Sequence, residues 1–330
     1  MNRMIQKLIS FVLRCRLEDV MAFGISAALV TFFWLTHVFS SIQFGMHDLI
    51  FILLPITILG IKCLLELLFS RDTESGENLD PAKYLVIFFK PLVKIIRDWF
   101  PFLLLSAAYY SLYGNLILRA NSHTADATLA RIDGFLLGNQ PSIMLQPYIS
   151  PWLTDFLYFI YFSYVFSLPA VALYFYVTRA EKIFRRVMMG YLLLMLMGMG
   201  GYLLVPAVGP EAFLAGQYTH DLLGRSFSRS VGYIISVGRV GTDCFPSLHV
   251  GIPFLLSFYL RDYKKKLFIP CLVYVGLMCC ATIYLRYHYL IDVIAAFVFA
   301  PAAYWLNDFL LARWPGEKIS IDAVKNRTTA

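Results

Sequence analysis

The chain has 330 residues, 59% hydrophobic and only 15% charged, whereas soluble domains average about 25% charged residues. This composition excludes an ordinary soluble domain, and apolar blocks of ~20 residues indicate an integral membrane protein. The net charge of +7 comes from basic residues that flank these blocks, so membrane topology accounts for it and nucleic-acid binding is not expected.

The N-terminal part of the chain predicts an addition to the main membrane domain. A basic, apolar start interrupted by Lys7 and Arg14 is interpreted as an uncleaved amphipathic segment on the membrane surface. Apolar blocks at 19–41 and 46–69 predict two transmembrane helices. A polar loop follows, and then an apolar stretch with interspersed lysines that predicts an interfacial helix. These elements together make up the N-terminal part, residues 1–98.

Six further apolar blocks follow, at 99–119, 151–178, 185–207, 247–260, 266–285 and 289–312. The proline-containing segment between the first two of these alternates apolar and polar residues and is expected to lie along the membrane surface. Long continuous blocks favour helices over a closed barrel, whose strands show weak alternation over about 10 residues. The predicted fold is therefore all-α and polytopic, with about eight transmembrane helices and a cytoplasmic tail at 314–330.

The lysines set the expected orientation. Every lysine falls on one side of this arrangement, including Lys182 and the run at 264–266, and the positive-inside rule makes that side cytoplasmic. Both termini are expected there. The opposite side carries arginines but no lysine and would be the periplasmic or outer face.

The sequence FPSLH begins the apolar block 247–260 on the outer side. Pro246 suits a helix start, and Ser247 is a candidate N-cap. A helix N-terminus offers unpaired N–H groups and the positive end of the helix dipole, which together bind anions. His249 therefore falls in the first turn of a helix with an anion site, where Ser247 is a cap, a phosphate ligand, or both.

A second polar group lies in TIYLRYHYLID, where the last two blocks join, also on the outer side. His288 and Asp292 are four residues apart and share one face of a helix. An ionised Asp292 would accept a hydrogen bond from one imidazole nitrogen and leave the other unprotonated, which makes a neutral histidine a nucleophile. Arg286 adds positive charge two residues before His288.

Two histidines from distant segments are thus predicted at the same depth, an arrangement that suits attack on phosphorus. His288 would form a phosphohistidine, and His249 would protonate the departing oxygen and then deprotonate the acceptor. Arg286, Arg239, Ser247 and the helix-start N–H groups would bind the phosphoryl oxygens. No carboxylate cluster suited to Mg²⁺ and no C-x-x-C pair occurs, so neither a metal nor another cofactor is expected.

These motifs resemble those of the type 2 phosphatidic acid phosphatase superfamily. Its Pro-Ser-x-His motif is matched by Pro246, Ser247 and His249, and the end of its last motif by His288 and Asp292.

Two departures from the family pattern are visible. The family's earliest motif, a lysine followed by Arg-Pro, is absent, and its Ser-Arg pair would fall at Thr282 and Ile283. Arg286 either replaces the missing arginine or anchors the chain at the interface. These departures favour the inositol phosphorylceramide synthase branch, an inositolphosphotransferase group with bacterial members. The resemblance to that bacterial set implies a protein of a bacterial inner membrane.

The resemblance implies a six-helix catalytic core, here 99–313, with its site at one membrane face. It implies transfer of a phosphate-linked headgroup from a phospholipid donor to a lipid or alcohol acceptor. A lipid phosphate phosphatase that uses the same residues is the alternative. A transporter or scaffold is a third possibility, disfavoured because the polar residues gather at one face and no internal repeat is evident.

Three other polar residues are candidates for headgroup binding: Arg225, Arg229 and Asp243. Exposed loop positions are the alternative for the two arginines. Asp243 either orients His249 or solvates its loop.

Overall fold

The computed structural model describes residues 16–21, 23–25, 27, 94–103, 105, 109 and 123–314, except 179, 226, 239 and 240. The predicted spans at 19–41, 46–69 and 99–119 therefore lie wholly or largely outside the described residues. The chain forms two compact units, one of Met1–Val20 with Tyr113–Ala330 and one of Met21–Leu112. In the latter, residues 94–103 are helical, and Lys94 Nζ donates to Asp98 Oδ2 at 2.7 Å.

The larger unit contains only helices among its described elements, apart from one isolated bridge between Ala207 and Asp243. In chain order the elements are α6 (Asp126–Leu137), α7 (Pro141–Met144), η3 (Gln146–Tyr148), α8 (Pro151–Val177), α9 (Glu181–Leu204), α10 (Pro210–Phe213), η4 (Ala215–Gln217), α11 (Phe227–Gly238), α12 (Leu248–Tyr263), η5 (Lys265–Leu267), α13 (Phe268–Tyr284) and α14 (Leu290–Arg313). The all-α prediction is confirmed for these residues.

Four stretches of the described chain are long and apolar enough to cross a membrane: Pro151–Val177, Glu181–Leu204, Lys265–Tyr284 and Leu290–Arg313. The protein is therefore an integral membrane protein. Helix α12 coincides with the predicted block 247–260, but its 16 residues fall short of the ~20 that a span needs. The total of about eight spans stays a prediction.

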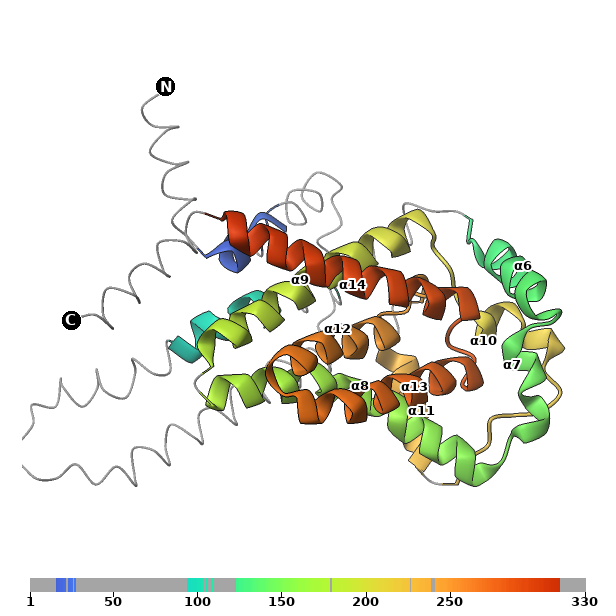
Figure 1. Cartoon of the computed structure of the whole chain (residues 1–330). Coiled ribbons are helices and arrows are strands. Elements are labelled where there is room, and N and C mark those ends of the chain that lie inside the picture. Colours follow the sequence, from blue (N-terminus) through green and yellow to red (C-terminus); the bar gives the residue numbers. More distant parts are fainter. Residues whose placement is uncertain are drawn as a thin grey trace, which may run out of the picture. The chain divides into compact units, whose positions relative to one another are not determined.

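Helix α12 is the centre of the larger unit, because it packs against α8, α9, α13 and α14 (Figure 1). Ten of its residues are buried, including Pro253 within the helix. Helices α9 and α14 also pack on each other, as do α8 and α13. A residue in the first turn of α12 is therefore surrounded by the ends of longer helices.

Several of these helix ends meet at one end of the unit. Tyr284, the last residue of α13, places its hydroxyl 2.9 Å from Thr154 Oγ1 in the first turn of α8. The Ser247 N–H, just before α12, donates to the Asp292 carbonyl oxygen in α14 at 3.1 Å. Figure 1 shows α6, α7 and α10 at this same end. The two histidine-bearing motifs therefore share one end of the helices.

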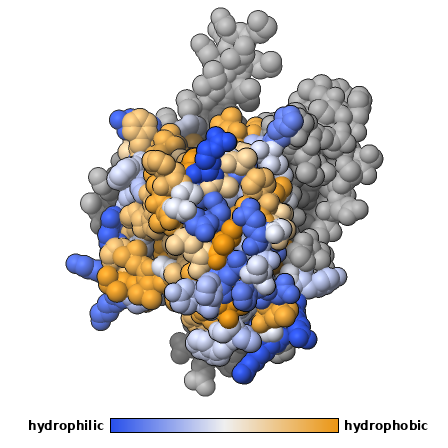
Figure 2. All heavy atoms as spheres, turned by 90° about the vertical axis from the view of Figure 1, so that its right-hand side faces the viewer, coloured by the Kyte–Doolittle hydropathy of each residue, from blue (hydrophilic) through white to orange (hydrophobic). Residues whose placement is uncertain are grey.

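The surface of this end combines polar and apolar side chains, as the view in Figure 2 shows. Phe135 of α6, Met144 of α7, Tyr148 of η3 and Trp152 at the start of α8 are exposed. Exposed aromatic residues beside polar ones are typical of the membrane–water boundary. The segment expected along the membrane surface thus forms part of this end.

Glycines on α9 let α12 approach closely. A methyl group on Gly198 would lie 2.7 Å from Leu248 Cδ1, and one on Gly201 would overlap the Pro246 ring. Small residues allow helix backbones to approach in membrane proteins. The absence of a side chain at Gly201 therefore allows Pro246, and with it the FPSLH motif, to lie against α9.

The opposite end carries a separate polar network around Arg186 of α9. Its guanidinium donates to Asp308 of α14, with Nε 2.8 Å from Oδ1, and to the hydroxyl groups of Tyr263 and Tyr304. Lys182 and the lysines at 264–266 are near the same helix ends. The lysine-rich turns and the histidines are therefore at opposite ends of the helices.

Candidate active site

The two histidines predicted to meet do so. His249 is in the first turn of α12 and His288 is in the turn between α13 and α14, and His249 Nδ1 lies 3.2 Å from His288 Nε2. His288 is only 3% exposed, while His249 is half-buried. The short contact joins segments that are 39 residues apart in sequence.

Asp292 lies behind His288. Its Oδ2 is 3.4 Å from His288 Nδ1, and the same oxygen accepts a 2.8 Å hydrogen bond from the Tyr289 N–H. This hydrogen bond pairs the backbone N–H of the residue just before α14 and orients the Asp292 carboxylate. With Nδ1 facing a carboxylate, the proton of a neutral His288 belongs on Nδ1 and its Nε2 carries the lone pair. His249 Nδ1 is then the donor between the rings.

A third side chain, Cys244, completes this buried group. Its thiol donates to Asp292 Oδ2 at 2.9 Å and lies 3.7 Å from His288 Nδ1. Burial raises the pKa of the Cys244 thiol well above its ordinary value, which keeps it a proton donor to the carboxylate. Sequence reasoning missed this contact because a single cysteine outside a C-x-x-C pair gives no local sign of a partner 48 residues away in the chain.

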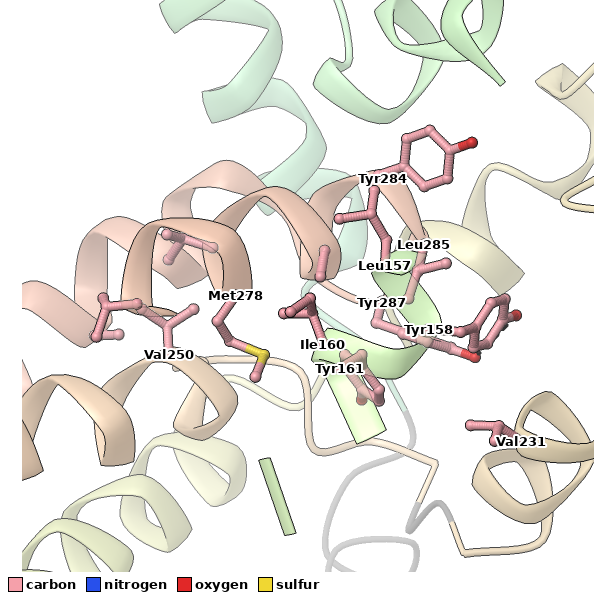
Figure 3. Packing of buried hydrophobic residues seen from close by; sticks show 14 residues of the cluster. Leu157, Tyr158, Ile160, Tyr161, Val231, Val250, Met278, Tyr284, Leu285 and Tyr287 are labelled. Carbon is pink, nitrogen blue, oxygen red and sulfur yellow. Dashed lines mark hydrogen bonds between the residues drawn. The ribbon is translucent and has the colours of Figure 1, made fainter. Parts of the chain in front are cut away.

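Aromatic rings of α8 hold His249. The Tyr161 ring stacks on the imidazole at a centroid distance of 4.5 Å and an angle of 23°, and Tyr164 lies at the same centroid distance. Tyr287 packs on Tyr161 at 4.6 Å, and its hydroxyl lies 3.5 Å from that of Tyr158 (Figure 3). The two tyrosine rings therefore hold the His249 imidazole in a fixed orientation.

The start of α12 has the features of an anion site. Ser247 is its N-cap residue, is fully buried, and has a hydroxyl without a hydrogen-bond partner among the described residues. A buried unpaired hydroxyl costs about 1–3 kcal/mol unless something uses it. The hydroxyl and the first N–H groups of α12 lie one turn or less from His249, where they are available to phosphoryl oxygens.

Two aspartates of α6 that sequence reasoning missed hold the His288 segment in place. Asp133 accepts backbone hydrogen bonds from Leu290 at 2.7 Å and Ile291 at 3.0 Å, the first two residues of α14. Burial raises the pKa of Asp133, and the two donors oppose this shift. Asp126 accepts the Tyr289 hydroxyl at 2.9 Å and the Gly209 N–H at 2.9 Å.

The spacing of these two aspartates in the sequence could have identified them. They are seven residues apart, two helical turns, and therefore share a face of α6. Both are fully buried, and buried carboxylates are rare unless they are paired. Two acidic residues at this spacing, on one face of a helix, indicate bound donors.

Arg286 lies close to the histidine segment but is engaged elsewhere. It has a left-handed backbone with φ of 66°, and its guanidinium lies 3.7 Å from the centre of the Tyr218 ring and donates to the His220 carbonyl oxygen. It is buried, which lowers its pKa, and its Nε has no hydrogen-bond partner among the described residues. The phosphate-binding role predicted for it stays a prediction.

Three of the remaining predicted residues are at least partly exposed. Arg225 and Arg229 are exposed, and the Arg225 N–H donates to the Asp155 carboxylate of α8 at 3.1 Å. Asp243 is half-buried and forms the isolated bridge with Ala207. Arg239 lies outside the described residues. Thr282, at the first position of the expected Ser-Arg pair, donates its hydroxyl to the Cys279 carbonyl at 3.0 Å.

Comparison with known families gives one match. A family model described as the PAP2 superfamily matches residues 127–306, which is more than half of the chain and includes Cys244, His249, His288 and Asp292. No curated protein and no solved structure matches the chain.

Proposed function

Since the chain belongs to the PAP2 superfamily, we propose that it transfers a phosphate-linked headgroup from a phospholipid donor to a lipid or alcohol acceptor through phospho-His288. Membership in this superfamily supports a lipid phosphatase or phosphotransferase activity in general. The transfer reaction and the inositol phosphorylceramide synthase branch are the specific parts of the proposal. The observation that carries it is the series of contacts from Asp292 through His288 to His249.

In the first step, His288 Nε2 attacks the donor phosphorus. The N–P bond forms as the bond from phosphorus to the glycerol oxygen breaks, and His249 gives that oxygen a proton. Asp292 holds the other nitrogen of His288 and stabilises the positive charge that develops on the ring. The products of this half are a diacylglycerol and a headgroup phosphate bound to His288.

In the second step, the acceptor hydroxyl attacks the phosphohistidine. His249, now neutral, takes the hydroxyl proton, an O–P bond forms and the N–P bond breaks. His249 and His288 return to their starting protonation states. The acceptor carries the headgroup phosphate away, so the reaction consumes no water.

Charge on the phosphoryl oxygens requires positive partners. Ser247 and the first N–H groups of α12 are the nearest candidates, since the hydroxyl is buried and unpaired among the described residues. Arg286 would contribute through its unpaired Nε, and Arg239 through its nearness in sequence to the motif. Arg225, Arg229 and Asp243 are proposed to contact the headgroup outside this centre.

Burial favours transfer over hydrolysis. His288 is 3% exposed and Asp292 is fully buried, and Tyr161 and Tyr164 cover the His249 ring. A phosphohistidine in such a setting is shielded from water, as transfer to an alcohol requires. In topology, the lysine-poor end with the histidines is proposed to face the periplasm of a bacterial inner membrane, with both termini in the cytoplasm.

Purified protein in phospholipid vesicles tests this function. With a phospholipid carrying a labelled phosphate and a lipid alcohol as acceptor, we expect a labelled acceptor lipid and free diacylglycerol, identified by mass spectrometry. Release of a water-soluble phosphate at the same rate with and without the acceptor would instead identify a phosphatase. No labelled product in either case, with intact His288, would contradict both activities. Lipid analysis of cells with and without the protein then identifies the donor.

A further inference from the structure

Three different metal-binding atoms meet next to the proposed nucleophile. Cys244 Sγ lies 2.9 Å from Asp292 Oδ2 and 3.7 Å from His288 Nδ1, and the last two atoms are 3.4 Å apart. All three side chains are buried, and the ligand atoms lie within 4.8 Å of one another. The second carboxylate oxygen, Asp292 Oδ1, is buried without a hydrogen-bond partner among the described residues. The group therefore has unused acceptor capacity.

The spacing of these atoms suits a tetrahedral metal site. Zinc bonds of about 2.0–2.3 Å to sulfur, nitrogen and oxygen place the ligand atoms of a tetrahedron about 3.3–3.6 Å apart. The observed separations bracket this range, and only Sγ and Oδ2, now joined by the thiol proton, must move apart. A thiolate, an imidazole and a carboxylate together select zinc or a similar thiophilic cation.

We propose that Cys244, His288 and Asp292 form a binding site for Zn²⁺ or another thiophilic divalent cation, and that the bound ion switches off the phosphotransfer. The second half of this inference rests on the proposed function. Thiolate and carboxylate neutralise the charge of the ion, so the complex carries no net charge in its buried position. The thiol proton is released to solvent when the ion binds.

The switch follows from the tautomer of His288. A metal bound to Nδ1 takes the position of the proton that faces Asp292, and the imidazole then carries its proton on Nε2. Nε2 loses the lone pair that would attack phosphorus. The proton between the rings moves from His249 Nδ1 to His288 Nε2 and the displaced Nδ1 proton of His288 leaves to solvent, so the hydrogen bond reverses, with His288 donating to His249 Nδ1. The ion therefore blocks the nucleophile without occupying the space between the two histidines.

Cadmium binding to purified protein tests the site without any need for turnover. The probe is the sulfur-to-cadmium charge-transfer band in the ultraviolet, measured on a variant whose only cysteine is Cys244. We expect one cadmium ion per chain, no band when Cys244 is also replaced by serine, and at least about tenfold weaker binding after His288→Ala. A band that His288→Ala and Asp292→Asn leave unchanged would identify a lone thiol and overturn the proposal.

Unmodified protein gives a second measurement that does not depend on variants folding. Zinc-edge X-ray absorption of the stoichiometric zinc complex should show one sulfur ligand, with nitrogen and oxygen ligands for the rest. A zinc environment without sulfur, or with several sulfurs, would overturn the site.

Inhibition tests the switch. Zinc should inhibit phosphotransfer, and Cys244→Ser should need at least about tenfold more zinc for the same fractional loss, each variant being compared with its own metal-free rate. Cys271→Ser, which changes another free cysteine of the described chain, is the matched control and should respond like the unmodified protein. Equal sensitivity of all three proteins would contradict the switch. If no turnover is found at all, the proposed function fails while cadmium binding still tests the site.

Discussion

His249 Nδ1 and His288 Nε2 are 3.2 Å apart, close enough to share a hydrogen bond and too close to hold a phosphorus atom between them. Reacting atoms approach to about 3–3.5 Å before attack, and the leaving oxygen must fit beyond the phosphorus. The rings must therefore separate when the substrate phosphate enters. While the two rings are in contact, His249 covers the lone pair of the nucleophile.

A complex with orthovanadate should show this separation. Vanadate adopts the five-coordinate geometry of phosphorus during transfer, so it should enter between the rings and move the two nitrogens more than about 5 Å apart. The measurement is a structure of the vanadate complex. Vanadate bound elsewhere, with the two imidazoles still in contact, would contradict the assignment of His249 and His288 to opposite sides of the phosphorus.

The proton-donor role of His249 predicts a dependence on the leaving group. His249→Ala should slow transfer from a natural phospholipid by about 10²–10⁴-fold, the usual contribution of a general acid. With a p-nitrophenyl phosphodiester, whose leaving group needs no proton, the burst of p-nitrophenol should slow much less. The control is His123→Ala, which changes an exposed histidine. An equal loss of rate with both substrates would contradict the proton-donor role of His249.

Gly201 and its neighbour Gly200 provide a matched pair in α9. A methyl group on Gly201 would overlap the Pro246 ring and come within 3.1 Å of the Phe245 carbonyl oxygen, whereas one on Gly200 meets nothing within 4 Å. Gly201→Ala should therefore displace the FPSLH motif and lower kcat by at least about tenfold, given how sensitive catalysis is to a misplacement of about 1 Å. Gly200→Ala should keep full activity. Indistinguishable kcat values for the two variants would show that this contact does not position the motif.

Asp133 should act as a positioning residue for His288. Asp133→Ala leaves the Leu290 and Ile291 N–H groups without their acceptor, at a cost of about 1–3 kcal/mol per unsatisfied group. We expect a lower kcat with little change in KM and a lower unfolding temperature in detergent. Asp133→Asn keeps one acceptor oxygen and should recover part of kcat. Full activity of the alanine variant would show that α14 holds His288 without this help.

The sequence predicted the meeting of the histidines but not what holds them. Apolar blocks and the lysine distribution put His249 and His288 at the same depth, and the four-residue spacing put Asp292 behind His288. Membrane topology suffices for the shared depth. The shared helix face expected for His288 and Asp292 is wrong, because His288 lies in the turn before α14 and Asp292 reaches it from the first turn of that helix. Cys244 was not predicted, because its contact with Asp292 depends on how the chain approaches α12.

The backbone conformation of Arg286 and the role of α6 could not be predicted from sequence patterns. Spacing put Arg286 beside His288, but its positive φ and its stacking on Tyr218 direct the guanidinium to the His220 carbonyl. Local spacing carries no information about such a turn. Helix α6 was predicted only to lie along the membrane surface, whereas Asp126 and Asp133 bind backbone and hydroxyl groups of two separate segments, at Gly209 and at 289–291.

The phosphoenzyme is the most direct test of the central claim, that His288 carries the phosphoryl group. Purified protein mixed with phospholipid labelled at the phosphate, without acceptor, is quenched in base and digested, and the modified residue is found by mass spectrometry. We predict an acid-labile, base-stable label on the His288 imidazole that disappears when an acceptor alcohol is added and is absent from His288→Ala. Label on another residue, or turnover retained by His288→Ala, would contradict the account.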